Sequence, residues 1–122
     1  MINRDWAEAF ARDWIAAWNA HDLERILTHY ADDFEMTSPL IVERMGVPSG
    51  CLKGKDAIRA YWGQGLAKTP ALQFDLMKVL AGVNSVAMLY RSLTAQRMVL
   101  ERIEFDERLR GVRAEALHGP IE

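Results

Sequence analysis

The order of patterns along the chain constrains the fold most strongly, because helical periodicity fills the first half and long extended segments fill the second. Four segments, at 72–81, 84–93, 96–106 and 110–118, have the composition of strands, and only short turns separate them. Strands joined by short turns pair with their sequence neighbours in an antiparallel arrangement. We therefore predict an antiparallel meander and an α+β chain, with the helices gathered on one face of a bent sheet.

Two helices are predicted before the first strand. Residues 5–20 carry one apolar stripe with the spacing of an amphipathic helix, with an aromatic residue at every fourth position. These aromatic residues are Trp6, Phe10, Trp14 and Trp18. Asp22 is a suitable N-cap for a second, short helix that runs from Leu23 to about Tyr30.

A strand, a long loop and a third helix are predicted to complete the first half. Residues 34–38 alternate as a strand, which Pro39 ends because proline cannot donate to a strand ladder. Residues 40–54 contain a proline and three glycines, and we interpret them as a long loop of the kind that is often functional. Residues 55–68 then predict a helix with an apolar inner face, weakened by two glycines.

Composition narrows the class of protein. A length of 122 residues predicts a single domain over 1–122. Fifteen Lys+Arg against seventeen Asp+Glu give a net charge of −2, which lacks the basic excess of a nucleic-acid binder. No apolar run approaches the ~18 residues of a transmembrane helix, no secretory signal is expected, and the single Cys51 allows no internal disulfide. We expect a soluble, cytoplasmic protein without nucleic-acid or membrane partners.

Two stretches carry a family resemblance. Residues 30–39 read YADDFEMTSP and residues 54–66 read GKDAIRAYWGQGL. With the element order, they resemble the NTF2-like superfamily, nearest its ketosteroid isomerases and SnoaL-like polyketide cyclases, over about Trp6 to His118. The resemblance implies a cystatin-like α+β cone in which a curved antiparallel sheet and three helices enclose an apolar pocket. It also implies a homodimer formed through the outer face of the sheet.

The catalytic residues of the isomerases transfer only in part. The family's general-base aspartate precedes the proline that ends the first strand, and that position is Ser38. A serine without an activating partner cannot abstract a proton α to a carbonyl near neutral pH. The oxyanion tyrosine matches Trp14, the second oxyanion donor matches Glu101, and two further pocket tyrosines match Tyr30 and Trp62. The resemblance therefore argues against a standard ketosteroid isomerase.

Strand alternation, combined with the inward face of the family, predicts a mostly apolar pocket for a small, largely apolar molecule. The predicted ligand-binding residues are Trp14, Trp18, Tyr30, Met36, Trp62, Met88 and Glu115. The predicted catalytic residues are Glu101 as acid or base, with Tyr90, Ser38 and Trp14 as hydrogen-bond donors to a substrate oxygen. Two alternatives stay open. Glu101 either faces the pocket or pairs outward with an arginine, and the last strand, which carries Glu115, could face either way.

Two classes of function follow. A carboxylic acid beside a tyrosine favours a cofactor-free enzyme of the isomerase, cyclase or hydratase kind, whereas the loss of the strand-end aspartate favours a non-catalytic ligand-binding or dimerisation domain. We predict no cofactor, because no phosphate-binding or dinucleotide motif occurs, and no metal, because His21 and His29 lack a ligand spacing. Cys51 has no activating partner nearby. On the outer face, Leu89, Met98 and Leu100 would form an exposed apolar patch, so we expect a two-fold homodimer.

Overall fold

Six strands form one curved sheet, in the order β2-β1-β6-β5-β4-β3. The computed structural model describes residues 1–121. Its strands are β1 (Tyr30–Thr37), β2 (Cys51–Lys53), β3 (Phe74–Ala81), β4 (Ser85–Ser92), β5 (Arg97–Phe105) and β6 (Gly111–Pro120), and its helices are α1 (Arg4–Asn19), α2 (Leu23–Leu27), α3 (Pro39–Met45) and α4 (Lys55–Lys68). The predicted α+β class and the antiparallel meander from β3 to β6 are confirmed. One contact is parallel, between β1 and β6.

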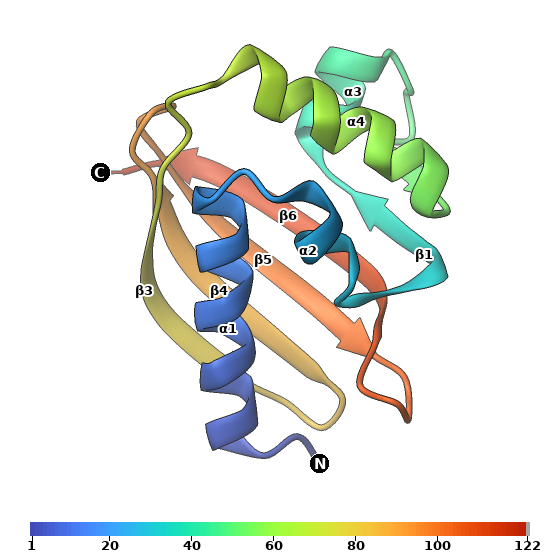
Figure 1. Cartoon of the computed structure of the whole chain (residues 1–122), viewed down its shortest axis with the longest axis vertical. Helices are drawn as coiled ribbons and strands as arrows, with labels where there is room; N and C mark the ends of the chain where they lie inside the picture. The colour runs from blue at the N-terminus through green and yellow to red at the C-terminus, as the bar shows by residue number, and fades with distance from the viewer. Residues whose placement is uncertain (122) are drawn as a thin grey trace.

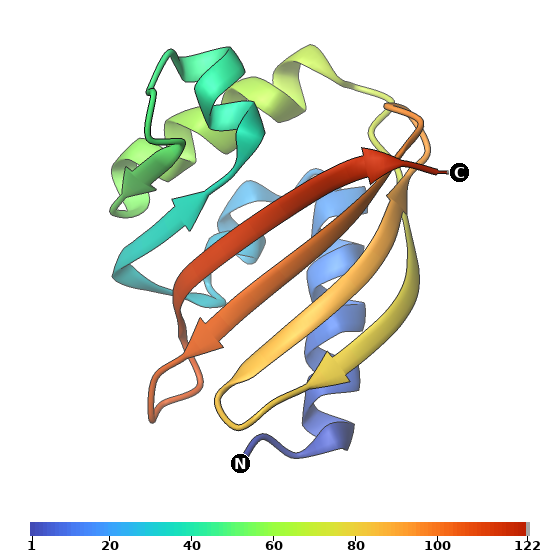
Figure 2. The same ribbon diagram turned by 180° about the vertical axis from the view of Figure 1, so that it is seen from behind.

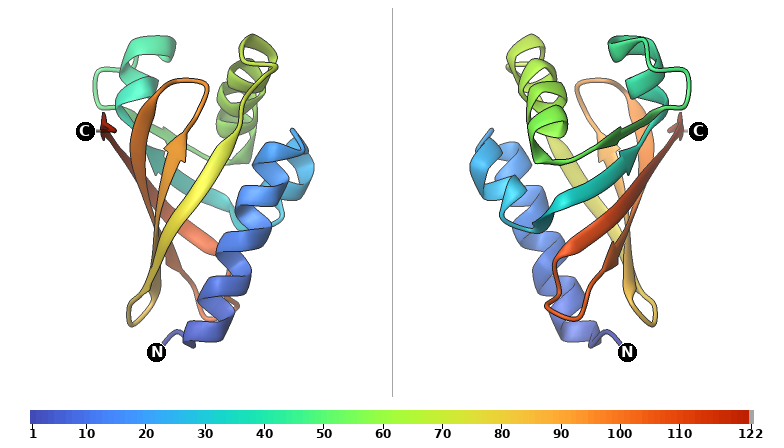
Figure 3. Two further views of the ribbon diagram at one scale, coloured as in Figure 1. Left: turned by 90° about the vertical axis from the view of Figure 1, so that its left-hand side faces the viewer. Right: turned by 90° about the vertical axis from the view of Figure 1, so that its right-hand side faces the viewer.

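The helices lie on the concave side of the sheet. Figure 1 shows α1 crossing this face, with α4 across the wide end beside the loop that leads to β3. The side views in Figure 3 show the curved sheet on one side of the molecule and both helices on the other. Seen from behind, in Figure 2, the convex face of β3 to β6 carries no helix. The arrangement is a cone whose interior is bounded by the sheet, α1 and α4.

The aromatic stripe of α1 forms the core of this cone. Asn3 caps the helix by accepting a hydrogen bond from the Trp6 amide at 3.1 Å. Near the start of the helix, Trp6 and Phe10 pack against Phe105. Nearer its end, the larger set of aromatic residues packs together at the wide end of the cone. This set is Trp14, Trp18, Tyr30, Phe34, Trp62, Phe74 and Tyr90.

The second helix is shorter than predicted, because Tyr30 belongs to β1. Tyr30 pairs with Gly111 of β6, and its buried ring lies against this glycine. A Cβ at position 111 would be 2.8 Å from Tyr30 Cδ1, too close for any other residue. Strand β1 therefore begins at Tyr30, opposite Gly111, which has no side chain to collide with the tyrosine ring. The preceding helix α2 ends at Leu27.

The predicted loop at 40–54 is wrong, since this stretch contains α3 and β2. Ser38 ends the strand as an N-cap, because its Oγ accepts a hydrogen bond from the Leu40 amide at 3.2 Å. Pro39 then occupies the first turn of a helix, where its missing N–H and fixed φ are favourable. Gly46, in the left-handed region with φ +67°, ends α3, and Cys51 pairs with Thr37 in β2.

Burial along the strands confirms the predicted alternation. Every second side chain of β4 is buried, and from Val99 to Phe105 the same pattern holds in β5. Two open questions are thereby resolved. Glu101 faces the interior, with 3% of its surface exposed, and β6 turns Ala114 and Ala116 inward.

The convex face of the sheet divides into a charged part and an apolar part. Glu104 and Glu35 form ion pairs with Arg113, and Glu104 also pairs with Arg102. Further along the strands, Leu89, Leu100 and Leu117 occupy one row across three strands. That row is partly to half exposed. None of the helices in residues 1–121 has the length and apolarity that a bilayer-spanning helix requires.

Candidate functional site

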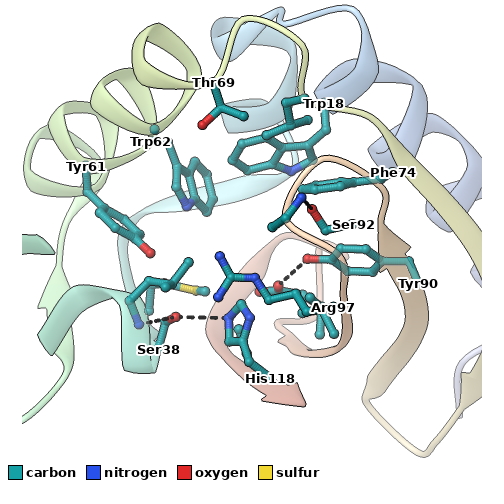
Figure 4. Close-up of a pocket in the computed structure, with 18 of the residues that line it drawn as sticks. Trp18, Ser38, Tyr61, Trp62, Thr69, Phe74, Tyr90, Ser92, Arg97 and His118 are labelled. Atoms are coloured by element: carbon teal, nitrogen blue, oxygen red, sulfur yellow. Dashed lines mark hydrogen bonds between the residues drawn. The ribbon is translucent and has the colours of Figure 1, made fainter. Parts of the chain in front are cut away.

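A cavity of about 110 Å³ lies inside the wide end of the cone, between the sheet, α1, α3 and α4. Its walls are aromatic and apolar over most of their extent, and Figure 4 shows Trp18, Trp62, Phe74 and Tyr90 around it. Polar side chains reach it from only a few positions. The lining polar and charged residues are Ser38, Arg44, Tyr61, Thr69, Tyr90, Ser92, Arg97, Glu101 and His118.

Glu101 is a buried carboxyl group that this cavity reaches. One of its oxygens accepts a hydrogen bond from the Tyr90 hydroxyl at 3.3 Å, and the other, Oε2, has no partner among the described residues. Burial raises the pKa of Glu101 to about 8, against a smaller lowering by the Tyr90 hydrogen bond. The carboxyl group is therefore mostly protonated at neutral pH, and its O–H can donate a hydrogen bond.

His118 is a second titratable group on the cavity wall, and the sequence analysis did not select it. Its Nε2 lies 3.5 Å from Ser38 Oγ, while its Nδ1 is buried without a partner among the described residues. Burial lowers the pKa of His118, and the positive charges of Arg97 and Arg44 lower it further. The imidazole is therefore mostly neutral at pH 7. Its signal in the sequence was the inward parity of Ala114, Ala116 and His118 on one strand.

The three proposed hydrogen-bond donors have different surroundings. The Tyr90 O–H donates to Glu101 Oε1, so its predicted role as a direct donor to a substrate oxygen is wrong, and it contacts the proposed acid instead. The Trp14 Nε1–H donates to the Tyr30 hydroxyl at 2.9 Å in the core, so its predicted role as a donor to substrate is wrong. The Ser38 oxygen is engaged in capping α3, and its hydroxyl lies beside His118 at the edge of the cavity. Ser38 thus has a structural role that residue matching alone did not predict.

The other predicted ligand-binding residues fall into three groups. Trp18, Met36 and Trp62 line the cavity together with Trp14. Tyr30 and Met88 are fully buried but do not line it, because their side chains are part of the core around it. Glu115 is exposed on the convex face, so its prediction as a pocket residue is wrong. The alternation of β6, set by Ala114 and Ala116, turns it outward.

Unpartnered polar atoms concentrate at this cavity. Within residues 1–121, four buried side-chain nitrogen or oxygen atoms have no hydrogen-bond partner. Three of them, Trp18 Nε1, Glu101 Oε2 and His118 Nδ1, belong to residues that line the cavity. Since buried polar groups in native proteins are nearly always satisfied, such a concentration needs an explanation.

Metal-binding and thiol sites have no support elsewhere in the described part of the chain. His29 Nε2 lies 2.8 Å from Asp13 Oδ2, in a cluster that also includes Arg25. Residues 1–121 contain no group of three His, Cys, Asp or Glu side chains arranged to hold a metal ion. Cys51 is a free, partly buried thiol on β2.

The curved sheet, the covering helices and the internal cavity define an NTF2-like α+β protein. The family model described as a SnoaL-like domain matches residues 11–114, so the chain belongs to the SnoaL-like family. It is also similar to the crystal structure of a SnoaL-like protein of unknown function from Burkholderia thailandensis. The two are 48% identical with a TM-score of 0.94, over 97% of this chain and 98% of the other.

More distant structures share the fold alone. A proposed isomerase of the SnoaL-like family from Agrobacterium tumefaciens is 17% identical, with a TM-score of 0.74 over 93% of this chain and 97% of the other. The proposed hydroxylase AclR from Streptomyces galilaeus is 16% identical, with a TM-score of 0.72 over 96% and 91%. No curated protein sequence matches the chain. The resemblance predicted from the sequence is therefore confirmed at the level of family and fold.

Proposed function

We propose that this protein binds a small, largely apolar carbonyl compound in its cavity and catalyses a cofactor-free acid–base reaction on it, of the isomerase, cyclase or hydratase kind. The observation that carries the proposal is the unpartnered Oε2 of Glu101, a buried carboxyl oxygen on a residue that lines an aromatic cavity. An unsatisfied buried carboxyl costs stability, and a substrate oxygen at this position would satisfy it.

Glu101 acts as the acid in this proposal. With its pKa raised to about 8, the carboxyl group is protonated at neutral pH and can donate a hydrogen bond to a carbonyl oxygen. That bond strengthens as negative charge develops on the oxygen during enolisation. Tyr90 donates to Oε1 at 3.3 Å and so fixes the orientation of the carboxyl group.

His118 acts as the base. Its pKa is lowered by burial and by two nearby arginines, so its neutral form is available at pH 7. The register pairs Glu101 with Ala116 and Val99 with His118, which makes Glu101 and His118 diagonal neighbours on the inner face. The Cα atoms of such neighbours are roughly 7–8 Å apart, so the two side chains leave the sheet on the same side and can both reach one small substrate. His118 removes the α-proton and returns it to the same carbon or to a neighbouring one.

The size of the cavity limits the substrate. Its volume of about 110 Å³ is somewhat below the roughly 150 Å³ of an engineered protein cavity that binds benzene. A molecule with a single ring or a short chain matches this volume, whereas a four-ring steroid is several times larger. The proposed substrates are therefore small ketones, enones or related carbonyl compounds.

Deuterium exchange at the α-carbons of cyclohexanone in D₂O, followed by proton NMR, tests the proposal. We expect the wild-type protein to accelerate exchange over buffer, and Glu101→Gln and His118→Gln each to lose about 10² to 10⁴ of that acceleration. Glu104→Gln is the matched control, because Glu104 lies on the same strand but pairs with Arg102 on the convex face. Exchange equal to buffer, or unchanged by both substitutions, would contradict the proposal.

A non-catalytic ligand-binding domain is the second candidate. It is favoured by Ser38, which replaces the family's strand-end carboxylate and whose oxygen is engaged by the Leu40 amide. In that case cyclohexanone should quench the fluorescence of the cavity tryptophans without exchanging its protons.

We further propose that the protein is a homodimer that pairs through the row of Leu89, Leu100 and Leu117, which is partly to half exposed on the convex face.

A further inference from the structure

The rim of the cavity carries positive charge without a carboxylate partner. Arg97 begins β5 and Arg44 lies on α3, and both line the cavity. Within residues 1–121, neither guanidinium takes part in a side-chain hydrogen bond or an ion pair. The sheet arginines Arg91, Arg102 and Arg113 differ, because each pairs with an aspartate or glutamate.

Arg97 is directed toward the cavity. Figure 4 shows its guanidinium beside His118, on the side of the cavity that also carries Tyr61 and Ser38. Its position follows from strand parity, since Arg97, Val99 and Glu101 occupy alternate sites on β5. The guanidinium of Arg44 reaches the same rim from α3 and lies against α4, where Nη1 is 3.4 Å from the place of a Cβ on Gly65.

The charges around the cavity do not cancel. At pH 7 the buried Glu101 is mostly protonated and His118 is mostly neutral. Glu43, next to Arg44 and like it exposed on α3, acts on His118 in the opposite sense to the arginines, less strongly than Arg97 but more strongly than Arg44. Two guanidinium groups against one carboxylate therefore leave the rim with a net positive charge that favours an anion.

We propose that the ligand of this cavity is a small carboxylate, whose anionic group binds Arg97 and Arg44 at the rim and whose apolar body extends between the tryptophans toward Glu101. This inference rests on the proposed function and gives its substrate a chemical class, that of a small oxo- or unsaturated carboxylic acid. A planar carboxylate matches the donor geometry of a guanidinium group.

Separation of the two polar regions supports this class. Glu101 owes its raised pKa to burial and is influenced in the opposite direction by Tyr90, with no contribution from Arg97. The acid at the inner end of the cavity and the arginines at the rim are thus distinct, and on the inner face of β5 Val99 lies between Arg97 and Glu101. A ligand that satisfies both regions has an anionic group at one end and a hydrogen-bond acceptor at the other.

Binding of benzoate and of its neutral analogue benzamide, measured by tryptophan fluorescence at low salt and pH 7, tests the proposal. A single ring is the largest apolar body that the volume of about 110 Å³ admits, and the two probes differ mainly in charge. We expect benzoate to bind at least tenfold more tightly than benzamide, and added salt to reduce the difference. Equal affinities, or no binding of either probe, would overturn the proposal.

Single substitutions test which arginine causes the preference for benzoate over benzamide. Arg97→Gln should reduce the benzoate preference to within about twofold, Arg97→Lys should keep part of it, and Arg108→Gln should leave it unchanged. Arg108 is the matched control, since it is exposed in the turn between β5 and β6, at the end of the sheet away from the cavity. Circular dichroism melts establish that each variant is folded. A preference that survives in Arg97→Gln would contradict the assignment.

A pH titration and the exchange assay separate this inference from the proposed function. Above pH 8, ionisation of Glu101 should weaken benzoate binding to the wild type, and Glu101→Gln should not show this decline. A benzoate preference without ketone exchange would support the carboxylate site and reject the catalytic role. Ketone exchange without a benzoate preference would support the catalytic role and reject the carboxylate site.

Discussion

Glu101 and His118 lie on neighbouring antiparallel strands, two residues out of register on the concave face, and their pKa values are shifted in opposite directions. Burial favours the uncharged form of each group, and that form is the acid for glutamic acid and the base for histidine. Both partners of an acid–base reaction are therefore present together at neutral pH. Groups whose surroundings separate their pKa values in this way are typical of acid–base sites.

The first prediction concerns the pH dependence of ketone exchange. Exchange requires neutral His118 and protonated Glu101, so the rate should be bell-shaped, with an acid limb below pH 6.5 and a basic limb near pH 8. Tyr90→Phe removes the hydrogen bond that lowers the pKa of Glu101, and the basic limb should move to higher pH. A basic limb at the same pH in this variant would show that another group sets it.

The second prediction concerns the effect of Glu101 on stability. Its pKa is about 8 in the folded protein and about 4.5 in the unfolded chain, so the native state binds more protons between these values. The wild type should therefore be most stable relative to Glu101→Gln below pH 4.5, and should lose this stability as the pH rises toward 8. At pH 7 the glutamine variant should be more stable by a few kcal/mol.

Urea unfolding of both proteins between pH 4 and 9 measures this difference. Glu104→Gln is again the control, since the pKa of Glu104 is lowered, first by its hydrogen bond with Arg102. Glu104→Gln removes the ion pair with Arg102 and should therefore lower the free energy of unfolding above pH 4.5, by ~1 kcal/mol at most for a pair near the surface. A Glu101→Gln variant no more stable than the wild type at pH 7 would contradict the burial of an unpaired carboxyl group.

The third prediction concerns the buried hydrogen bond from Trp14 to Tyr30, 2.9 Å long. Tyr30→Phe leaves the indole N–H unpaired, and Trp14→Phe leaves the hydroxyl unpaired, so each should cost about 1–3 kcal/mol, with an added cavity cost for the tryptophan. In the double variant no polar atom of the pair remains. A double-mutant cycle by urea unfolding should give a coupling of about 1 kcal/mol, and additive effects would contradict the bond.

The alternating pattern of the strands was the most reliable basis for predicting which side chains face the interior. A period of two fixes which face a side chain occupies, so the inward positions of Met36 and Tyr90 followed once one face was assigned to the core, whereas the direction of Glu101 stayed open. The prediction that Glu115 lines the pocket was wrong because Val112, Ala114 and Ala116 form one apolar set. The same parity that turns them inward turns Glu115 outward.

Local capping and long-range contacts were harder to predict. Ser38, Pro39 and Gly46 are the cap, first turn and end of a helix, but the same residues are also typical of a loop. Arg97 and His118 were missed because a polar or charged residue at the end of a strand usually faces solvent. Only the three-dimensional arrangement shows that the ends of β5 and β6 meet at a cavity.

The fourth prediction concerns Ser38 and steroid isomerisation. With a serine in place of the family's base and a cavity of about 110 Å³, the wild type should not isomerise a 3-oxo-Δ5 steroid, and measurable turnover would contradict this.

The variant Ser38→Asp should fold normally, because aspartate also caps helices, whereas Ser38→Ala should lose about 1 kcal/mol of unfolding free energy. The new carboxylate beside His118 should raise the pKa of the histidine and move the acid limb of ketone exchange to higher pH.

The last prediction concerns the proposed homodimer. Leu117 is 48% exposed and is continuous with Leu89 and Leu100 across the convex face, so a second copy would bury an apolar row that is otherwise in water. A two-fold axis through antiparallel strands would bring the same row of both copies together. Light scattering at tens of micromolar should give a dimer for the wild type and a monomer for Leu117→Glu. Val83→Glu is the matched control, because Val83 is 74% exposed in the turn between β3 and β4, away from this row. A monomeric wild type, or a Leu117→Glu variant that remains dimeric, would show that this face is not the interface.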